Sequence, residues 1–192
     1  MRNIIILMLV LISGNVQAAE IAGVKFNPIY QDHGAAMMLQ GTGLKSVFFI
    51  KAFAAGFYKG EGANTDLLGN FPKRIEVQYF VNIPGAKLNN FTINTMKDNV
   101  SKEELEAISG KVKEMGQYFV DLKPGDRFAL TYIPNIGTQF THNGHLTGIV
   151  EGLDFARALF SVWIGAKPFD DKLKKQVLGL GVRYDRHNEK NS

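Results

Sequence analysis

The side chains that could bind a small molecule are few in this sequence, and they are basic or phenolic. Lys45 can pair with a carboxylate as a point charge, or it can be a solvated lysine in a hairpin. Lys51 is a single charge in an apolar segment, so it either extends its ammonium group to the rim of a cleft or lies inside the cleft as a functional group. Tyr58, Tyr79 and Tyr132 are either hydrogen-bond donors to a ligand or core tyrosines whose hydroxyl groups reach the sheet edge. The chemistry offered by this set is recognition of an anionic or hydrogen-bonding group.

Metal and cofactor chemistry find little support in the sequence. The chain has no cysteine, which excludes disulfides, thiolate catalysis and cysteine-ligated metals. His142 and His145 flank a predicted turn and project to the same side, but no third metal ligand accompanies them. The nucleotide-binding glycine motifs, the HExxH zinc motif and the GxSxG nucleophile motif do not occur. The sequence therefore predicts no metal site, no cofactor and no catalytic residue.

The charge distribution argues against one further class of partner. The net charge is +4, and the one cluster of basic residues, Lys172, Lys174 and Lys175, has the spacing of a solvated helix face. Binding to nucleic acid is therefore not predicted, and the sequence identifies no protein partner. The 14 phenylalanines and 6 methionines are enough to line an adaptable apolar cavity, or simply to fill a core. The small residues 54–56 leave room either for a ligand or for a closely packed helix.

Residues 1–18 have the pattern of a secretory signal peptide. Arg2 supplies the positive charge, residues 4–12 form an apolar run, and Val16 and Ala18 place small residues at the third and first positions before a cleavage site. The apolar run is much shorter than the roughly 20 residues of a membrane-spanning helix. We expect cleavage after Ala18, no integral membrane segment in the mature chain, and a periplasmic location.

The elements that must position these side chains alternate between groups of strands and groups of helices. Asn143 and Gly144 predict a two-residue hairpin turn, because both residues tolerate positive φ. Ser101 and Glu104 form a capping box at the start of one helix, and Asp170 opens the last one. The predicted strands cover residues 24–26, 36–40, 47–58, 74–81, 127–133, 139–142 and 145–150, and the predicted helices cover 86–99, 102–119, 153–164 and 170–178.

This order of elements predicts the α+β class. Hairpins rather than βαβ crossovers connect the strands, so we expect an antiparallel sheet that is covered on one face by helices. A single domain over residues 19–182 holds these elements, and a polar tail covers residues 183–192.

Four segments of the chain resemble the bacterial branch of the chalcone isomerase-like family in their order and spacing. The resemblance extends from about residue 21 to residue 179, and it implies the open-faced β-sandwich of that family. The four segments are 41–58 (GTGLK followed by FIKAFAAGFY), 72–79 (PKRIEVQY), 123–127 (KPGDR) and 143–168 (NGHLTGIVEGLDFARALFSVWIGAKP).

The resemblance implies either ring closure or ligand binding. Chalcone isomerases use an arginine and a threonine to form a flavanone, and fatty-acid-binding members hold a carboxylate with an arginine and a tyrosine beside an apolar cleft. At the matching positions this chain has Lys45 instead of the arginine and Phe53 instead of the hydroxyl-bearing residue. Lysine keeps the charge but lacks the bidentate geometry, and phenylalanine donates no hydrogen bond. Both departures argue against flavonoid chemistry.

Three functions follow from these observations. The first is an exported, non-catalytic binder of an apolar or fatty-acid-like small molecule, with Lys45, Lys51, Phe53 and the three tyrosines as candidate contacts. The second is an isomerase or intramolecular lyase of the chalcone isomerase type on an unidentified substrate, which requires polar groups that converge in the cleft. The third is a structural or interaction protein whose cleft is filled by its own side chains.

Overall fold

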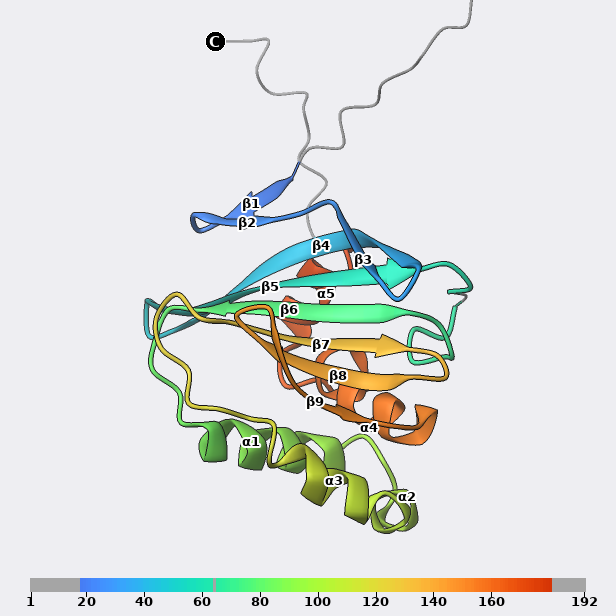
Figure 1. Ribbon diagram of the computed structural model, residues 1–192. Helices are drawn as coiled ribbons and strands as arrows, with labels where there is room; N and C mark the ends of the chain where they lie inside the picture. The colour runs from blue at the N-terminus through green and yellow to red at the C-terminus, as the bar shows by residue number, and fades with distance from the viewer. Residues whose placement is uncertain (1–17, 64, 181–192) are drawn as a thin grey trace, which may run out of the picture.

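The computed structural model describes residues 18–63 and 65–180, and its centre is an antiparallel sheet (Figure 1). Seven strands follow one another across the sheet in chain order. They are β3 (Ile29–Asp32), β4 (Ala35–Val47), β5 (Ile50–Gly60), β6 (Lys73–Tyr79), β7 (Arg127–Ile133), β8 (Gly137–His142) and β9 (His145–Val150). The predicted α+β class is confirmed.

The helices of the described chain lie on one side of this sheet (Figure 1). They are α1 (Gly85–Lys97), α2 (Lys102–Ala107), α3 (Ser109–Met115), α4 (Leu153–Ile164) and α5 (Asp171–Val177). The main core forms between α4 and the inward face of the strands, where Phe57, Ile75, Phe155 and Leu159 are fully buried. α4 is buried on most sides because almost all of its residues are apolar or small.

Two-residue hairpin turns with positive φ join several of the strands. Asn143 and Gly144 have φ of 50° and 82°, so the predicted turn between β8 and β9 is confirmed. Phe48 and Phe49 have φ of 46° and 68° and turn the chain from β4 into β5. The prediction of one strand over residues 47–58 is therefore wrong at its beginning, because β4 runs to Val47 and β5 starts only at Ile50.

The last helix lies close against β4 because that strand carries glycines. A Cβ atom added at Gly43 would lie 2.6 Å from Leu173 Cδ1, closer than van der Waals contact allows. Leu173 and Val177 are the buried residues of α5. The helix begins at the predicted place, and the Asp170 side chain caps it by accepting the Leu173 amide. The glycines of β4 thus fix the position of α5 at the side of the sheet.

The other face of the sheet is covered in part by a small hairpin of β1 (Ala19–Ile21) and β2 (Val24–Phe26). Val24 and Phe26 pack there against Ala54. Successive residues of β5 point to opposite faces, so Phe53, Ala55 and Phe57 belong to the helical side. This alternation decides which predicted residues can share a cleft.

The predicted helix over residues 102–119 is divided in two. Ser101 and Glu104 form the predicted capping box, but Ile108 has φ of −100° and ψ of 11° and separates α2 from α3. Helical structure ends at Met115, so Phe119 lies beyond it.

Two predicted segments lie outside the described residues: the signal peptide except for its last residue Ala18, and the polar tail over residues 183–192. Within residues 18–63 and 65–180, no helix is long and apolar enough to cross a membrane.

Candidate ligand-binding cleft

A cleft of about 490 Å³ opens between the sheet and the helices, near the turn from β4 into β5. Its size falls within the range of about 300–1,000 Å³ that is usual for small-molecule sites. Strands β4, β5 and β6 contribute to one side, and α1, α4 and the loop before α5 contribute to the other. The apolar and aromatic residues that line it are Val47, Ala52, Phe53, Tyr79, Val81, Ile83, Leu88, Phe91, Val162, Trp163 and Phe169.

Phe53 is surrounded by other aromatic rings of the cleft. Its ring centre lies 5.6 Å from that of Tyr79, 6.0 Å from Trp163 and 6.2 Å from Phe169. Phe91 of α1 extends the cluster through an edge contact with Phe169 at 5.5 Å. Tilted and edge-on pairs at these distances are favourable for aromatic side chains. The cleft therefore presents a continuous aromatic wall to a ligand.

A bulge in the β4–β5 pair places two neighbouring residues of β5 in this cleft. Lys45 pairs with Phe53 and Ser46 pairs with Lys51, so Ala52 is an extra residue without a partner in the ladder. Both Ala52 and Phe53 line the cleft. Lys51, in contrast, is exposed and does not line it.

Lys45 lines the cleft, but its charge is already paired. Its Nζ donates a hydrogen bond to Asp170 Oδ2 at 2.5 Å. The other oxygen of this carboxylate accepts the Leu173 amide at 2.7 Å. Burial alone would raise the pKa of Asp170, but the hydrogen bonds from Lys45 and from the amide outweigh it and lower the pKa below its usual value. A ligand carboxylate here must share Lys45 with Asp170.

Tyr79 brings a neutral hydrogen-bond donor to the cleft. Tyr79 of β6 pairs with Phe53 of β5. Phe53 is the residue at whose position the family resemblance implies a hydroxyl group. Burial raises the pKa of the Tyr79 phenol, so the hydroxyl keeps its proton at neutral pH. Among the described residues this hydroxyl has no hydrogen-bond partner. Tyr79 can therefore donate to a polar group of a ligand.

The cleft is nearly closed at its inner end. A second space of about 20 Å³ lies behind it and shares Tyr79, Leu88, Thr92 and Trp163 with the cleft. This space is about the size that one water molecule needs. An extended chain could pass beyond Trp163 only if core side chains moved.

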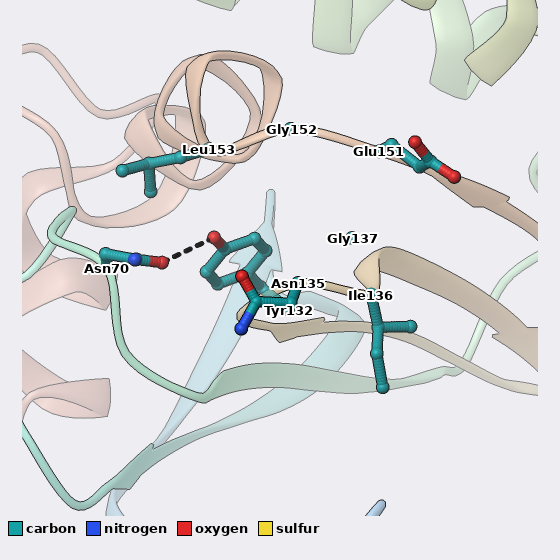
Figure 2. Close-up of a pocket in the computed structure, with 8 residues that line it drawn as sticks. All are labelled: Asn70, Tyr132, Asn135, Ile136, Gly137, Glu151, Gly152 and Leu153. Atoms are coloured by element: carbon teal, nitrogen blue, oxygen red, sulfur yellow. Dashed lines mark hydrogen bonds between the residues drawn. The ribbon is translucent and has the colours of Figure 1, made fainter.

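The remaining two predicted tyrosines lie elsewhere. Tyr58 is buried on the opposite face of the sheet, where it packs with Tyr30 and Met37. Tyr132 lines a separate pocket of about 290 Å³, where its hydroxyl donates a hydrogen bond to Asn70 Oδ1 at 2.7 Å (Figure 2). Of the six predicted contact residues, the structure thus brings together Lys45, Phe53 and Tyr79.

Several residues of the cleft carried no signal in the sequence. Phe91 is on α1 and Phe169 is in the loop after α4, and both resemble ordinary core residues when read along the chain. Asn82 and Lys87 add polar groups from the β6–α1 connection and the first turns of α1. Only the contact between distant segments reveals that these residues share a site.

The cleft is lined by three ionisable side chains of the described residues, Lys45, Tyr79 and Lys87. Among its described lining residues there is no carboxylate and no imidazole, the groups that most often act as general bases. His142 Nε2 lies 3.3 Å from Asp126 Oδ2, and neither residue lines the cleft. In the part of the chain that the structure describes, no group of three or more His, Cys, Asp or Glu side chains could hold a metal ion.

The fold and the cleft together define a class: an antiparallel sheet with a one-sided helical cover and an apolar pocket between them. The chain belongs to the chalcone isomerase-like family, whose model matches residues 18–179. Among solved structures it is similar to a fatty-acid-binding protein of Arabidopsis thaliana, with a TM-score of 0.66 and 17% sequence identity. That similarity covers 85% of this chain and 96% of the plant chain. No curated protein gives a significant match to the sequence.

Proposed function

We propose that this protein is an exported, non-catalytic binder of a fatty-acid-like small molecule, and that the ligand occupies the cleft beside Phe53. The observation that carries the proposal is the aromatic wall of Phe53, Tyr79, Trp163 and Phe169 around an open volume of about 490 Å³. Apolar surface of this extent favours a hydrocarbon ligand over a polar one. The structural similarity to a plant fatty-acid-binding protein supports the same class of ligand.

The polar groups of the cleft suggest how such a ligand is oriented. Its chain would contact the aromatic wall, and its carboxylate would accept hydrogen bonds from the neutral Tyr79 hydroxyl or from a lysine. Lys87 is exposed and lines the cleft, whereas Lys45 is shared with Asp170. We therefore expect a modest preference for a carboxylate over an alcohol of equal chain length.

Specific observations weigh against the two alternatives. Ring closure needs a cation free to favour a phenolate and donors that hold the enolate oxygen, but Lys45 is neutralised by Asp170 and Phe53 offers no donor. A purely structural role predicts a cleft filled by side chains, whereas open volume remains beside Phe53 in the described part of the chain.

The test uses a substitution that fills the cleft. Ala52→Phe adds a phenyl group to a lining residue of β5, and its matched control is Ala36→Phe, which adds the same group at an exposed position of β4. We expect Ala52→Phe to weaken binding of a long-chain fatty acid by at least about 10-fold, since a ligand would lose several methylene contacts. The control should bind like the wild type.

Isothermal titration with delipidated protein measures these affinities, and native mass spectrometry before delipidation detects a copurified ligand. Unchanged affinity in Ala52→Phe, or no binding by the wild type, would refute the assigned site. Turnover of a panel of chalcones above the buffer rate, followed by absorbance, would refute the non-catalytic assignment.

Export is the second part of the proposal, and it rests on the signal-peptide pattern of residues 1–18. Expression of the full chain in a Gram-negative host should deliver a protein that begins at Ala19 to the periplasmic fraction. Intact mass spectrometry of that fraction gives the new N-terminus. A protein that stays in the cytoplasm with Met1 retained would contradict this part alone.

A further inference from the structure

The hairpin between β4 and β5 ends in a tip of four consecutive apolar residues, 47–50. The exposed fraction is 49% for Val47, 90% for Phe48, 101% for Phe49 and 64% for Ile50. Single exposed apolar residues are common on protein surfaces. A contiguous apolar group that includes two fully exposed phenylalanines is a mark of an interaction site.

The conformation of the turn shows that these phenylalanines do not serve the turn itself. Phe48 and Phe49 have φ of 46° and 68°, a left-handed conformation that side chains with a Cβ atom rarely adopt. At the β8–β9 turn the same chain uses Asn143 and Gly144, the residues that suit this geometry best. Aromatic residues at the hairpin tip are therefore unfavourable both for the backbone and for contact with water.

The surroundings of the hairpin tip are cationic. Residues 43–53, the part of the hairpin next to the tip, contain two lysines and no acidic residue. Lys51 directly follows the tip and is exposed, and Lys87 lies on the adjacent α1 at the cleft. Lys45 is paired with Asp170, but among the described residues neither Lys51 nor Lys87 forms an ion pair.

An apolar tip with flanking lysines matches the surface of an anionic lipid bilayer. Aromatic side chains favour the boundary between headgroups and acyl chains, while lysines extend toward lipid phosphates. Four residues cannot by themselves bury the roughly 1,000 Å² or more that a specific protein interface requires. Insertion into a bilayer needs no complementary groove.

We propose that the hairpin tip, residues 47–50, docks the protein on anionic membranes. Lys45 and Val47 belong to both the hairpin and the cleft lining, which also includes Lys87 of α1, and the β4–β5 turn lies at the same end of the molecule as the start of α1 (Figure 1). Docking would bring the cleft to the bilayer surface, so that a lipid-like ligand could enter or leave without crossing water. The transfer of a ligand between bilayer and cleft rests on the proposed function, whereas the docking on the membrane does not.

The test separates loss of docking from loss of folding. Phe48→Asn combined with Phe49→Gly installs the residues that the turn geometry prefers, so thermal stability should stay equal or rise. In vesicle flotation with phosphatidylcholine and phosphatidylglycerol, the partition coefficient of this double variant should fall at least about 10-fold below that of the wild type. Leu146→Asn, which removes an exposed apolar side chain near the β8–β9 turn, is the matched control and should float like the wild type.

A charge variant and two further outcomes complete the experiment. Lys51→Gln should reduce binding to anionic vesicles and leave the weaker binding to pure phosphatidylcholine unchanged. Wild-type protein that does not float, or a double variant that floats equally well, would overturn the proposal. Concentration-dependent dimerisation in analytical ultracentrifugation that the double variant abolishes would overturn it in favour of a second copy. Fatty-acid affinity in solution should be the same in the double variant, because Phe48 and Phe49 do not line the cleft, so the two proposals can fail separately.

Discussion

Lys73 should weaken the folded state at neutral pH and cease to do so in alkaline solution. Its side chain is fully buried at the start of β6, where Nζ donates a hydrogen bond to the Gly69 carbonyl. The ammonium group lies 4.3 Å from the ring centre of Phe71 and 5.1 Å from that of Tyr132. Burial lowers the pKa of Lys73 to about 8, although the charge of Asp66 acts in the opposite direction.

The size of the effect follows from the difference in pKa between the two states. A lysine with a pKa of about 8 when folded and 10.5 when unfolded binds fewer protons in the folded state between these values. Stability therefore rises as the pH increases from 8 to 10.5, and it is lost as the pH falls through 8. From this residue alone, the free energy of unfolding should be about 2 kcal/mol larger at pH 9.5 than at pH 7.

The substitution Lys73→Met removes this titration and keeps the side-chain volume. The Gly69 carbonyl still accepts the Phe71 amide at 3.1 Å, so no acceptor is left without a partner. At pH 7 the variant should be about 1 kcal/mol more stable than the wild type, since the cost of the buried charge exceeds the cation–π attraction that is lost. At pH 9.5 the wild type should be at least as stable as the variant.

Urea unfolding followed by circular dichroism measures the difference in stability between the wild type and Lys73→Met at pH 7 and at pH 9.5. Lys113→Met, an exposed substitution on α3, is the control and should differ from the wild type by the same amount at both values. A difference between wild type and Lys73→Met that does not change with pH would refute the reasoning.

Three further predictions concern the cleft, a helix cap and the turn before β7. Asp170→Asn keeps a side-chain oxygen that can cap α5 but removes the negative charge that pairs with Lys45. Calorimetry should therefore show that the affinity for a fatty acid rises about 3- to 10-fold, while the affinity for the alcohol of the same chain length is unchanged. Equal gains for both ligands would contradict this prediction. Ser101→Ala removes the capping box of α2 and should lower stability by about 1 kcal/mol in urea unfolding; no loss would contradict it. Hydrogen bonds from Asn143 and a backbone amide lower the pKa of Asp126 to about 2, so its stabilisation is present above pH 4 and lost toward pH 2. The advantage of the wild type over Asp126→Asn should therefore shrink by about 1 kcal/mol over that interval, and an advantage that stays constant would contradict the assignment.

The parts of the fold that were predicted from the sequence are those with strong local signals. Asn143 with Gly144 at a turn, and Ser101 and Asp170 at helix starts, act through their own backbone preferences. The turn at Phe48 and Phe49 was missed because neither residue favours positive φ, so an apolar run over residues 47–58 resembled one buried strand.

The site was predictable in part for a similar reason. Lys45 and Phe53 lie in a segment whose spacing resembles a known family, and the structure places both at the cleft. Tyr79 was one of three equivalent tyrosines along the chain, and only the register that pairs it with Phe53 distinguishes it from Tyr58 and Tyr132. Lys51 does not line the cleft because the bulge at Ala52 shifts the register of β5. No sequence pattern predicted this bulge.

The insertion of α1, α2 and α3 between β6 and β7 has a consequence for how the chain folds. Every other neighbouring pair in the sheet is joined by a much shorter connection, but β6 and β7 can pair only after residues 80–126 close a loop. Closing that loop costs about 3 kcal/mol more than closing a two-residue hairpin turn. The sheet should therefore assemble as two halves, β3–β6 and β7–β9, that join late. Until the two halves join, the apolar edges of β6 and β7 can pair with strands of other chains. Aggregation during refolding should therefore begin at these two edges.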